Sequence, residues 1–189
     1  RCWGSNMGWT LGAYSGQSCD LGMPCSRTPV ALNNPSGLQF ALVYAGDGDG
    51  MTCAVATSSA AYCWGSGYLG DPAVGLSSKP VLVTGGLSFA SAGPGFGHSC
   101  GRATSGEAWC WGQGWAGQLG NGVAAPGTNS YVPVRAGTGT FSMVSAGSYH
   151  SCGVETGGQR ILCWGNNVLG QLGDGTTTNR STPTVAAGW

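Results

Sequence analysis

The chain has 189 residues, a formal net charge of zero and only 7% charged residues, against about 25% in average proteins. Its 37 glycines would suit a disordered segment, but 41% of the residues are apolar and 8 are tryptophan, which excludes that class. The seven basic residues are scattered, and no apolar run approaches the roughly 20 residues that span a bilayer. We therefore expect no nucleic-acid partner and no membrane span in this segment, and an all-β fold of short strands and tight glycine turns.

The first predicted unit, residues 1–37, opens with Cys2-Trp3-Gly4. A degenerate glycine loop follows at residues 7–12, then an insertion that contains Cys19 and Cys25, and then a strand at Pro29-Val30. We expect this segment to be a partial repeat unit that begins with the last strand of its hairpin.

Three fuller units follow, at residues 38–80, 81–132 and 133–182. Each begins with an apolar strand that ends in Ala-Gly, continues through a hairpin flanked by two cysteines, and closes with Cys-Trp-Gly. A glycine loop comes next, and a Pro-Val or Pro-Thr-Val strand is expected to open the following unit, because proline is tolerated at the start of a strand. Residues 183–189 are accordingly expected to be the first strand of a further unit.

The spacing of these units predicts the fold. Cys-Trp-Gly recurs every 47 to 61 residues, which is the period of propeller blades. A single four-stranded sheet cannot bury both of its faces, whereas radial stacking of several sheets does so. The sequence therefore predicts one repeat domain, a β-propeller of four-stranded blades with about three and a half blades present and the ring incomplete.

The combined pattern resembles a known family. His-Ser-Cys-Gly at His98 and His150, followed by Cys-Trp-Gly, Gly-Gln-Leu-Gly and Pro-Val, is similar to the regulator-of-chromosome-condensation type of repeat. The cysteine-bearing form is most similar to the extracellular repeats of crinkly-type plant receptor kinases and of secreted bacterial and algal proteins. The resemblance is specific in residues 87–188 and weaker in residues 1–86. It implies a propeller, usually of seven blades, and a family that includes a guanine-nucleotide exchange factor and a β-lactamase inhibitor.

The nine cysteines predict disulfides. In each full unit the two cysteines lie about equally far from a hairpin turn, so they face each other across antiparallel strands at a distance that suits a disulfide. The expected pairs are Cys53–Cys63, Cys100–Cys110 and Cys152–Cys163, with Cys19–Cys25 stapling the insertion. The chain contains no Cys-x-x-Cys pair of the kind that binds zinc, so we expect neither metal nor cofactor. Disulfides indicate an extracellular or secreted protein.

Cys2 is left unpaired by this scheme. The repeat rule places its partner about ten residues before it, so we expect a longer parent chain, or else assembly with other subunits.

No catalytic residue is expected. The two histidines, His98 and His150, occupy equivalent positions, which favours a structural turn hydrogen bond over catalysis. No carboxylate pair recurs in a pattern that general acid–base chemistry would need. The segment Asp47-Gly-Asp-Gly50 is similar to the start of a calcium loop, but position twelve is Ser58 instead of glutamate, so a polar loop is the simpler interpretation.

Two surface features remain. Asn179-Arg-Ser181 is an N-glycosylation sequon in a loop rich in threonine, where glycans are possible partners. Aromatic residues in predicted loops either pack between blades or form a binding face; they are Trp9, Tyr68, Trp115 and Tyr131. The hypothesis is a non-catalytic extracellular propeller that acts as a scaffold or protein-interaction module. The alternatives are a structural subunit of an extracellular filament or surface coat, and a secreted inhibitor or enzyme domain on the same scaffold.

Overall fold

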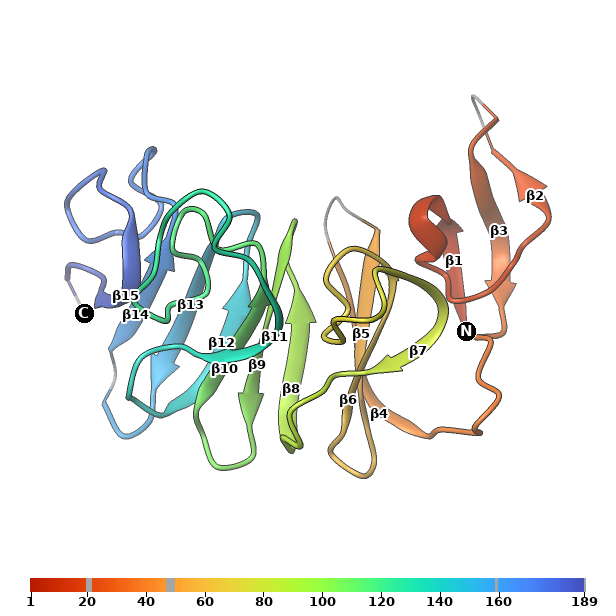
Figure 1. Ribbon diagram of the computed structural model, residues 1–189, viewed down its shortest axis with the longest axis horizontal. Coiled ribbons are helices and arrows are strands. Elements are labelled where there is room, and N and C mark those ends of the chain that lie inside the picture. The colour runs from red at the N-terminus through yellow and green to blue at the C-terminus, as the bar shows by residue number, and fades with distance from the viewer. Residues whose placement is uncertain (20–21, 47–49, 159, 189) are drawn as a thin grey trace.

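The computed structural model describes residues 1–19, 22–46, 50–158 and 160–188. Its strands form four antiparallel sheets that stand side by side in chain order, with the two termini at opposite ends of the row (Figure 1). Three sheets have four strands and the N-terminal one has three, so the prediction of about three and a half blades in an open ring is confirmed. No helix in the described part of the chain is long and apolar enough to cross a membrane.

The N-terminal sheet is the partial one. It contains β1 (Cys2–Ser5), β2 (Gln17–Ser18) and β3 (Pro24–Val30) in the order β1-β3-β2, with a single 3-10 turn, η1 (Met7–Trp9), after β1. The described part of the chain supplies no strand to the other edge of β1.

The three complete sheets are simple meanders in which each strand pairs with the next. The first contains β4 (Phe40–Ala45), β5 (Met51–Ala56), β6 (Ala61–Ser66) and β7 (Leu76–Leu82). The second contains β8 (Phe89–Pro94), β9 (His98–Ala103), β10 (Ala108–Gly112) and β11 (Ser130–Arg135). The third contains β12 (Phe141–Ala146), β13 (His150–Glu155), β14 (Ile161–Gly165) and β15 (Arg180–Val185).

The Pro-Val strands belong to a different sheet from the one that the sequence analysis assigned. The strand containing Pro80 pairs with β6 and so is the fourth strand of the sheet before it, through Cys63 opposite Val81. The strand containing Pro183 likewise pairs with β14 and completes the third sheet. The physical reason is that a glycine loop returns the chain antiparallel to the Cys-Trp-Gly strand, whose outer edge is still unpaired.

Every Cys-Trp-Gly strand has the same irregularity. The register with the outer strand shifts between the cysteine and the glycine in all four copies. The glycines at the shift have nearly identical backbone φ angles, between 105° and 108°, which favour glycine because a side chain is strained there. The motif therefore encodes a bulge as well as a buried tryptophan.

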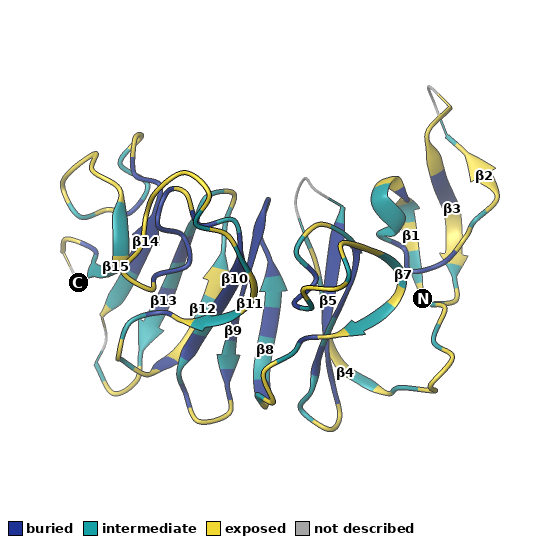
Figure 2. Cartoon of the chain, viewed as in Figure 1, coloured by how far each residue is buried: buried dark blue, intermediate teal, exposed yellow. Residues whose placement is uncertain are grey.

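The core lies between the sheets (Figure 2). In the complete sheets the motif tryptophans Trp64, Trp111 and Trp164 are at most 1% exposed. Each packs at a steep angle against the phenylalanine that opens its own sheet, with ring centroids 5.9–6.0 Å apart. Because the preceding sheet and its loop cover the motif tryptophan of each complete sheet, Trp3 in the N-terminal sheet has no such cover and is 65% exposed.

A polar contact joins the second and third sheets. The indole Nε1 of Trp164 and the hydroxyl of Ser151 both donate hydrogen bonds to the carbonyl oxygen of Gln118, each at 3.0 Å. The N-terminal interface repeats this arrangement, because Trp64 Nε1 and the Thr52 hydroxyl both donate to the carbonyl oxygen of Thr10, again at 3.0 Å. We call this arrangement the tryptophan clasp.

The interface between the first and second complete sheets lacks the clasp. The indole Nε1 of Trp111 is buried without a hydrogen-bond partner among the described residues. The loop responsible is shorter: Leu69 follows Trp64 by five positions, whereas Leu119 follows Trp111 by eight. The shorter loop still buries its leucine, but it presents no carbonyl to Trp111.

Gly120 is expected to be intolerant of a side chain. Its φ is +71°, and an added Cβ would lie 2.7 Å from Trp164 Nε1 and 2.8 Å from Ala136 Cβ. Gly122, in the same loop, has a φ of +88° but nothing within 4 Å of its Cβ position. We expect Gly120→Ala to lower the free energy of unfolding by about 2 kcal/mol more than Gly122→Ala does, because only the first adds overpacking to backbone strain. Urea unfolding of both variants measures this, and equal losses would contradict it.

The four predicted disulfides are present in the structure. Each full hairpin places its cysteines directly opposite each other with Cα atoms 4.1 Å apart, as Cys53–Cys63, Cys100–Cys110 and Cys152–Cys163. Cys19–Cys25 closes the insertion, and Cys2 is the free cysteine.

Removal of one hairpin disulfide has a predictable cost. The Cys100–Cys110 bridge closes a loop with a sequence separation of 10 residues. We expect the double variant Cys100→Ser/Cys110→Ser to lose about 2.5–3 kcal/mol of stability, since the unfolded chain regains the freedom that the bridge removes. Thermal unfolding monitored by tryptophan fluorescence tests this, and an unchanged midpoint would show that the bridge does not constrain the unfolded state.

Candidate interaction face

The two histidines lie at the start of strands instead of in turns, and His98 lies between two sheets. His98 on β9 is fully buried, and its Nε2 lies 2.8 Å from the hydroxyl oxygen of Ser151, which is also fully buried. Because the Ser151 hydroxyl donates to the carbonyl of Gln118, the His98 Nε2–H donates to Ser151. The sequence analysis expected a turn hydrogen bond here; the partner belongs to the neighbouring sheet because blade stacking brings β9 against β13.

This serine–histidine pair is no nucleophile site. Neither side chain has any exposed surface, so no substrate contacts them. Burial, with a smaller contribution from the charge of His150, lowers the pKa of His98 to about 3. Burial also lowers the pKa of His150, which is only partly buried.

The described carboxylates stabilise loops and turns through hydrogen bonds and ion pairs. Asp174 accepts hydrogen bonds from Thr176 and from the Arg180 guanidinium, and these two contacts hold its pKa below the usual range, Thr176 contributing most. Glu155 pairs with Arg160 across the β13–β14 turn. No cluster of three metal-ligating side chains exists among the described residues. The calcium-loop candidates Asp47 and Asp49 lie outside the described residues, as does Asp20.

The two ends of the sheets carry different loops (Figure 1). The hairpin turns and the connections between sheets along the lower edge consist mainly of serine, threonine and glycine, at residues 57–59, 84–86, 104–106, 137–140 and 156–158. The loops along the upper edge carry aromatic side chains instead, and their exposed surfaces are the ones that a partner would meet.

Three rings gather where the upper loops of the second and third sheets meet. Tyr149 lies between Phe96 and Trp115, with ring centroids 5.3 Å and 5.5 Å away. Phe96 and Tyr149 come from the β8–β9 and β12–β13 turns, and Trp115 comes from the glycine loop after β10. Trp115 is 42% exposed, so the cluster is open to solvent on one side.

A second aromatic pair continues this surface towards the N-terminal end. Tyr68 and Tyr131 pack in a tilted arrangement with ring centroids 4.8 Å apart. The Asn129 side chain links the two groups, because its Nδ2 donates to the Tyr68 hydroxyl at 2.8 Å and its Oδ1 accepts from the backbone N–H of Gly114 at 3.3 Å. We call the whole set the aromatic row: Tyr131, Tyr68, Asn129, Trp115, Tyr149 and Phe96.

Sequence reasoning found half of this row. Tyr68, Trp115 and Tyr131 were predicted as loop aromatics with two possible roles. Tyr131 lies instead at the start of β11, where the strand leaves the glycine loop, and all three side chains pack on neighbours while remaining partly exposed. Phe96 and Tyr149 were missed, although each lies within two positions of a motif histidine and so had to fall in an upper turn. Trp9 lies apart from the row, against Tyr14 at 6.2 Å.

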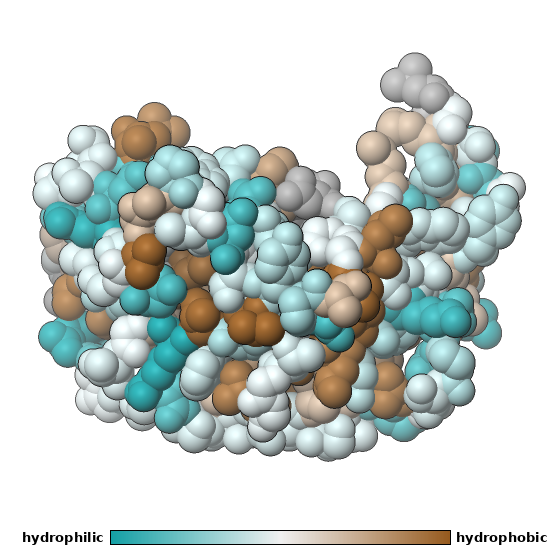
Figure 3. Space-filling view, in the orientation of Figure 1, coloured by the Kyte–Doolittle hydropathy of each residue, from teal (hydrophilic) through white to brown (hydrophobic). Residues whose placement is uncertain are grey.

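Apolar side chains are also exposed along the upper edge, where Figure 3 shows a protruding hydrophobic patch at the upper left. In the β14–β15 loop, Leu169 is 87% and Val168 is 59% exposed. The ion pair nearest in sequence, Arg180 with Asp174, is internally satisfied and offers little free charge. The face therefore suits a partner held by aromatic packing and neutral hydrogen bonds.

The sequon residue lies beside this face. Asn179 is exposed, and its Oδ1 accepts a hydrogen bond from the backbone N–H of Asn167 at 2.8 Å. The amide nitrogen to which a glycan would be attached is not used by that bond. Glycosylation at Asn179 stays a prediction.

Comparison with known families finds repeats in the second half of the chain. The family described as regulator of chromosome condensation (RCC1) repeat matches residues 105–154 and 159–188, and a second profile of the same description matches residues 144–171. A sequence comparison with curated proteins gave no significant match. Residues 105–188 therefore match RCC1 repeats, as the resemblance implied.

Comparison with solved structures extends this to the fold. Yeast RCC1 (Prp20) bound to Kap60 aligns with a TM-score of 0.72 at 18% identity, over 97% of this chain and 43% of that one. Human WBSCR16 aligns with a TM-score of 0.71 at 17% identity, over 89% and 43%. The receptor kinase CR4 ectodomain of Physcomitrella patens gives a TM-score of 0.50 at 22% identity, over 85% and 37%. The chain has the RCC1-type propeller fold and spans less than half the length of these structures.

Proposed function

We propose that this chain of RCC1-type blades is a non-catalytic protein-interaction module of an extracellular protein, and that it binds its partner through the aromatic row. The row carries the proposal, because it joins the loops of all three complete sheets into one partly exposed surface, while the opposite edge has only small polar tips. Tryptophan and tyrosine in such positions are the residue types that most often dominate binding energy.

The extracellular assignment rests on the cysteines. Four disulfides persist only in an oxidising compartment, and one of the structural neighbours is the ectodomain of a receptor kinase. An exchange-factor role would need a partner in a reducing compartment, where these bridges do not last. The charge content of 7% also leaves few groups for electrostatic recognition.

Site-directed photo-crosslinking tests the proposed face. A benzophenone amino acid replaces Trp115 in one variant and Ser58, at a tip of the opposite edge, in another. Incubation with the extracellular fraction of the source organism should give one dominant cross-linked species for the first variant only. Equal cross-linking from both positions, or from Ser58 alone, would overturn the assignment of the face.

The captured partner then permits a quantitative test. Trp115→Ala and Tyr131→Ala should each weaken binding by about 30-fold, which corresponds to a hot-spot loss of about 2 kcal/mol. Both side chains are more than 40% exposed, so the thermal midpoint should stay unchanged. Because the row carries no charge, binding should change little with salt, and a steep loss of affinity at high salt would contradict recognition by aromatic packing.

A further inference from the structure

Strand β1 is equivalent to the third strand of a complete sheet. Cys2 lies opposite Val30 as Cys63 lies opposite Val81, and both pairs are followed by the same bulge. The outer strands match as well: the hydroxyls of Ser26 and Ser77 both donate to the carbonyl two residues further on. β1 and β3 are therefore the outer half of a blade built on the common plan.

The position facing Cys2 is occupied in all three other sheets. There the equivalent cysteine has a hairpin strand beside it, with a cysteine directly opposite at a Cα–Cα distance of 4.1 Å. At β1 the corresponding edge pairs with no described strand, and Cys2 is the free cysteine. In the three complete sheets this position is filled by a cysteine of a hairpin strand, so the equivalent position opposite Cys2 would hold a hairpin cysteine as well.

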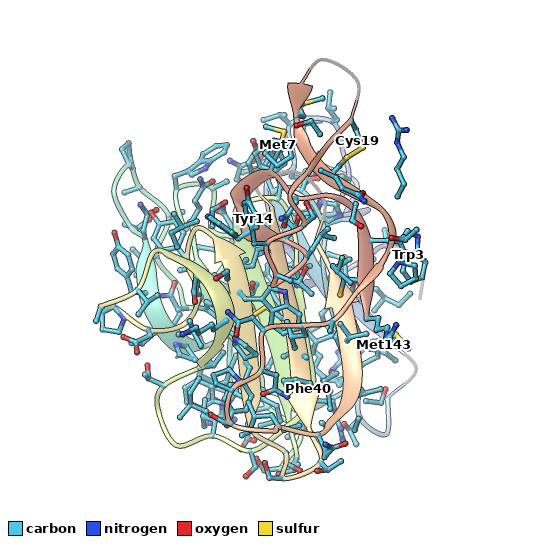
Figure 4. The ribbon with its side chains drawn as sticks, turned by 90° about the vertical axis from the view of Figure 1, so that its right-hand side faces the viewer. Trp3, Met7, Tyr14, Cys19, Phe40 and Met143 are labelled. Atoms are coloured by element: carbon cyan, nitrogen blue, oxygen red, sulfur yellow. A yellow bond between two sulfur atoms is a disulfide. The ribbon has the colours of Figure 1, made fainter. Side chains whose placement is uncertain are left out.

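A groove lies at this edge. It has a volume of about 780 Å³. Arg1 and Cys2, at the start of the chain and of β1, line one side, and Val43 and Ala45 of the inner strand β4 line the other. Figure 4 looks onto this end of the molecule, where Trp3 projects at the margin and Phe40 lies on the first complete sheet. The groove therefore lies between the outer half of the blade, formed by β1 and β3, and the face of β4. An inner pair of strands in that blade would cover this face.

Val43 shows that this face is apolar and bare. By register it corresponds to Ala92 on β8 and Val144 on β12. Ala92 is fully buried and Val144 packs on the cluster around Cys100, because a hairpin of the preceding sheet covers each of them. Val43 is 61% exposed. This exposure is independent of Cys2 and points to the same occupant.

We propose that the groove docks one further repeat hairpin, of the kind that this chain already carries three times, and that Cys2 joins it by a disulfide. The hairpin adds antiparallel to the free edge of β1 and covers Val43, and its second strand places a cysteine opposite Cys2. This site lies at the open end of the row of sheets and does not depend on the aromatic row.

The bond forms by thiol–disulfide exchange. The Cys2 thiolate attacks the sulfur of a hairpin cysteine that is held as a mixed disulfide with a small thiol. One S–S bond forms, one breaks, and the small thiol leaves as its thiolate, so that no net oxidation occurs. The mixed disulfide itself is the co-reactant, and low-molecular-weight disulfides of an oxidising compartment supply it.

A synthetic peptide tests the docking. The sequence of residues 88–104 is the suitable probe, because in the structure this hairpin covers Val144, the counterpart of Val43. The peptide, loaded as the glutathione mixed disulfide at the position of Cys100, is added to the intact disulfide-bonded protein. We expect a Cys2–peptide disulfide in non-reduced peptide mapping, formed at least about tenfold faster than with a scrambled peptide of equal composition.

Two controls separate docking from simple thiol reactivity. A peptide whose cysteine is moved by one position directs its sulfur to the other face of the strand and should react at the scrambled rate. Val43→Asp should slow capture about tenfold while leaving the reaction of Cys2 with a small alkylating reagent unchanged. Met143→Asp is the matched variant, since Met143 is 63% exposed on the inner strand of the third sheet, and it should not slow capture.

Equal rates for the native, shifted and scrambled peptides would overturn the proposal and leave Cys2 as an ordinary accessible thiol. Capture that is insensitive to Val43→Asp would also overturn it. Neither result bears on partner binding at the aromatic row, whose variants are measured separately.

Discussion

Trp164→Ala should lower the free energy of unfolding by about 3–5 kcal/mol, whereas Trp3→Ala should change it by less than about 0.5 kcal/mol. The two residues occupy the same place in the same Cys-Trp-Gly motif, so local sequence predicts equal effects. Trp164 is fully buried, packs on Phe141 and donates to the Gln118 carbonyl, while Trp3 is 65% exposed. Urea unfolding of the two variants, followed by far-UV circular dichroism, measures the difference.

The clasp itself is tested by phenylalanine at the same positions. Trp164→Phe removes an indole N–H that is hydrogen-bonded, and Trp111→Phe removes one that is buried without a described partner. The first should therefore cost about 1 kcal/mol more than the second, because deleting an unpaired buried donor relieves a desolvation penalty. A larger loss for Trp111→Phe would show that its N–H has a partner in solution.

Acid should destabilise the protein through His98. The pKa of His98 in the folded protein is about 3, below the usual 6.5. Between pH 6.5 and pH 3 the unfolded chain therefore binds a proton at His98 that the folded chain does not bind. The stability from this group is fully present above pH 6.5 and is lost as the pH falls, by at most about 1.4 kcal/mol per pH unit. Asp174 contributes only below its ordinary pKa of 3.8, which is outside most of this range.

His98→Met isolates this contribution. Methionine already occupies the equivalent position in the first complete sheet, where Met51 is 3% exposed, so the substitution suits the site. The variant should show a flatter decline in unfolding free energy between pH 6.5 and pH 4 than the parent, with the remaining slope coming partly from His150, whose pKa is also lowered. Parallel slopes for parent and variant would mean that His98 is protonated in the folded state.

The architecture could be predicted because its determinants are side chains at fixed spacing. Paired cysteines set back equally from a turn fix the hairpin register, and a tryptophan after each pair fixes which face is buried. The sheet membership of the Pro80 and Pro183 strands could not be fixed in that way. It depends on which edge a loop returns to, and the sequence of the strand is compatible with both.

The connections between sheets were beyond sequence reasoning for a different reason. The acceptor in each clasp is a backbone carbonyl, of Gln118 in one interface and Thr10 in the other, and a carbonyl carries no residue identity. The partnership of His98 with Ser151 is hidden likewise, because 53 positions separate the two residues. Phe96 and Tyr149 needed the turn geometry before they could be placed beside Trp115.

The short loop between Trp64 and Leu69 has a consequence for how the molecule opens. Sheets stacked in a row touch only their neighbours, so an interface that lacks the two hydrogen bonds of the clasp is a place where a cooperative array can divide. The interface without a clasp lies between β4–β7 and β8–β11, near the middle of the chain. Native-state hydrogen exchange should therefore reveal two subglobal opening units, residues 1–83 and residues 87–188, with amides along this seam exchanging at a lower free energy than those of β13 and β14.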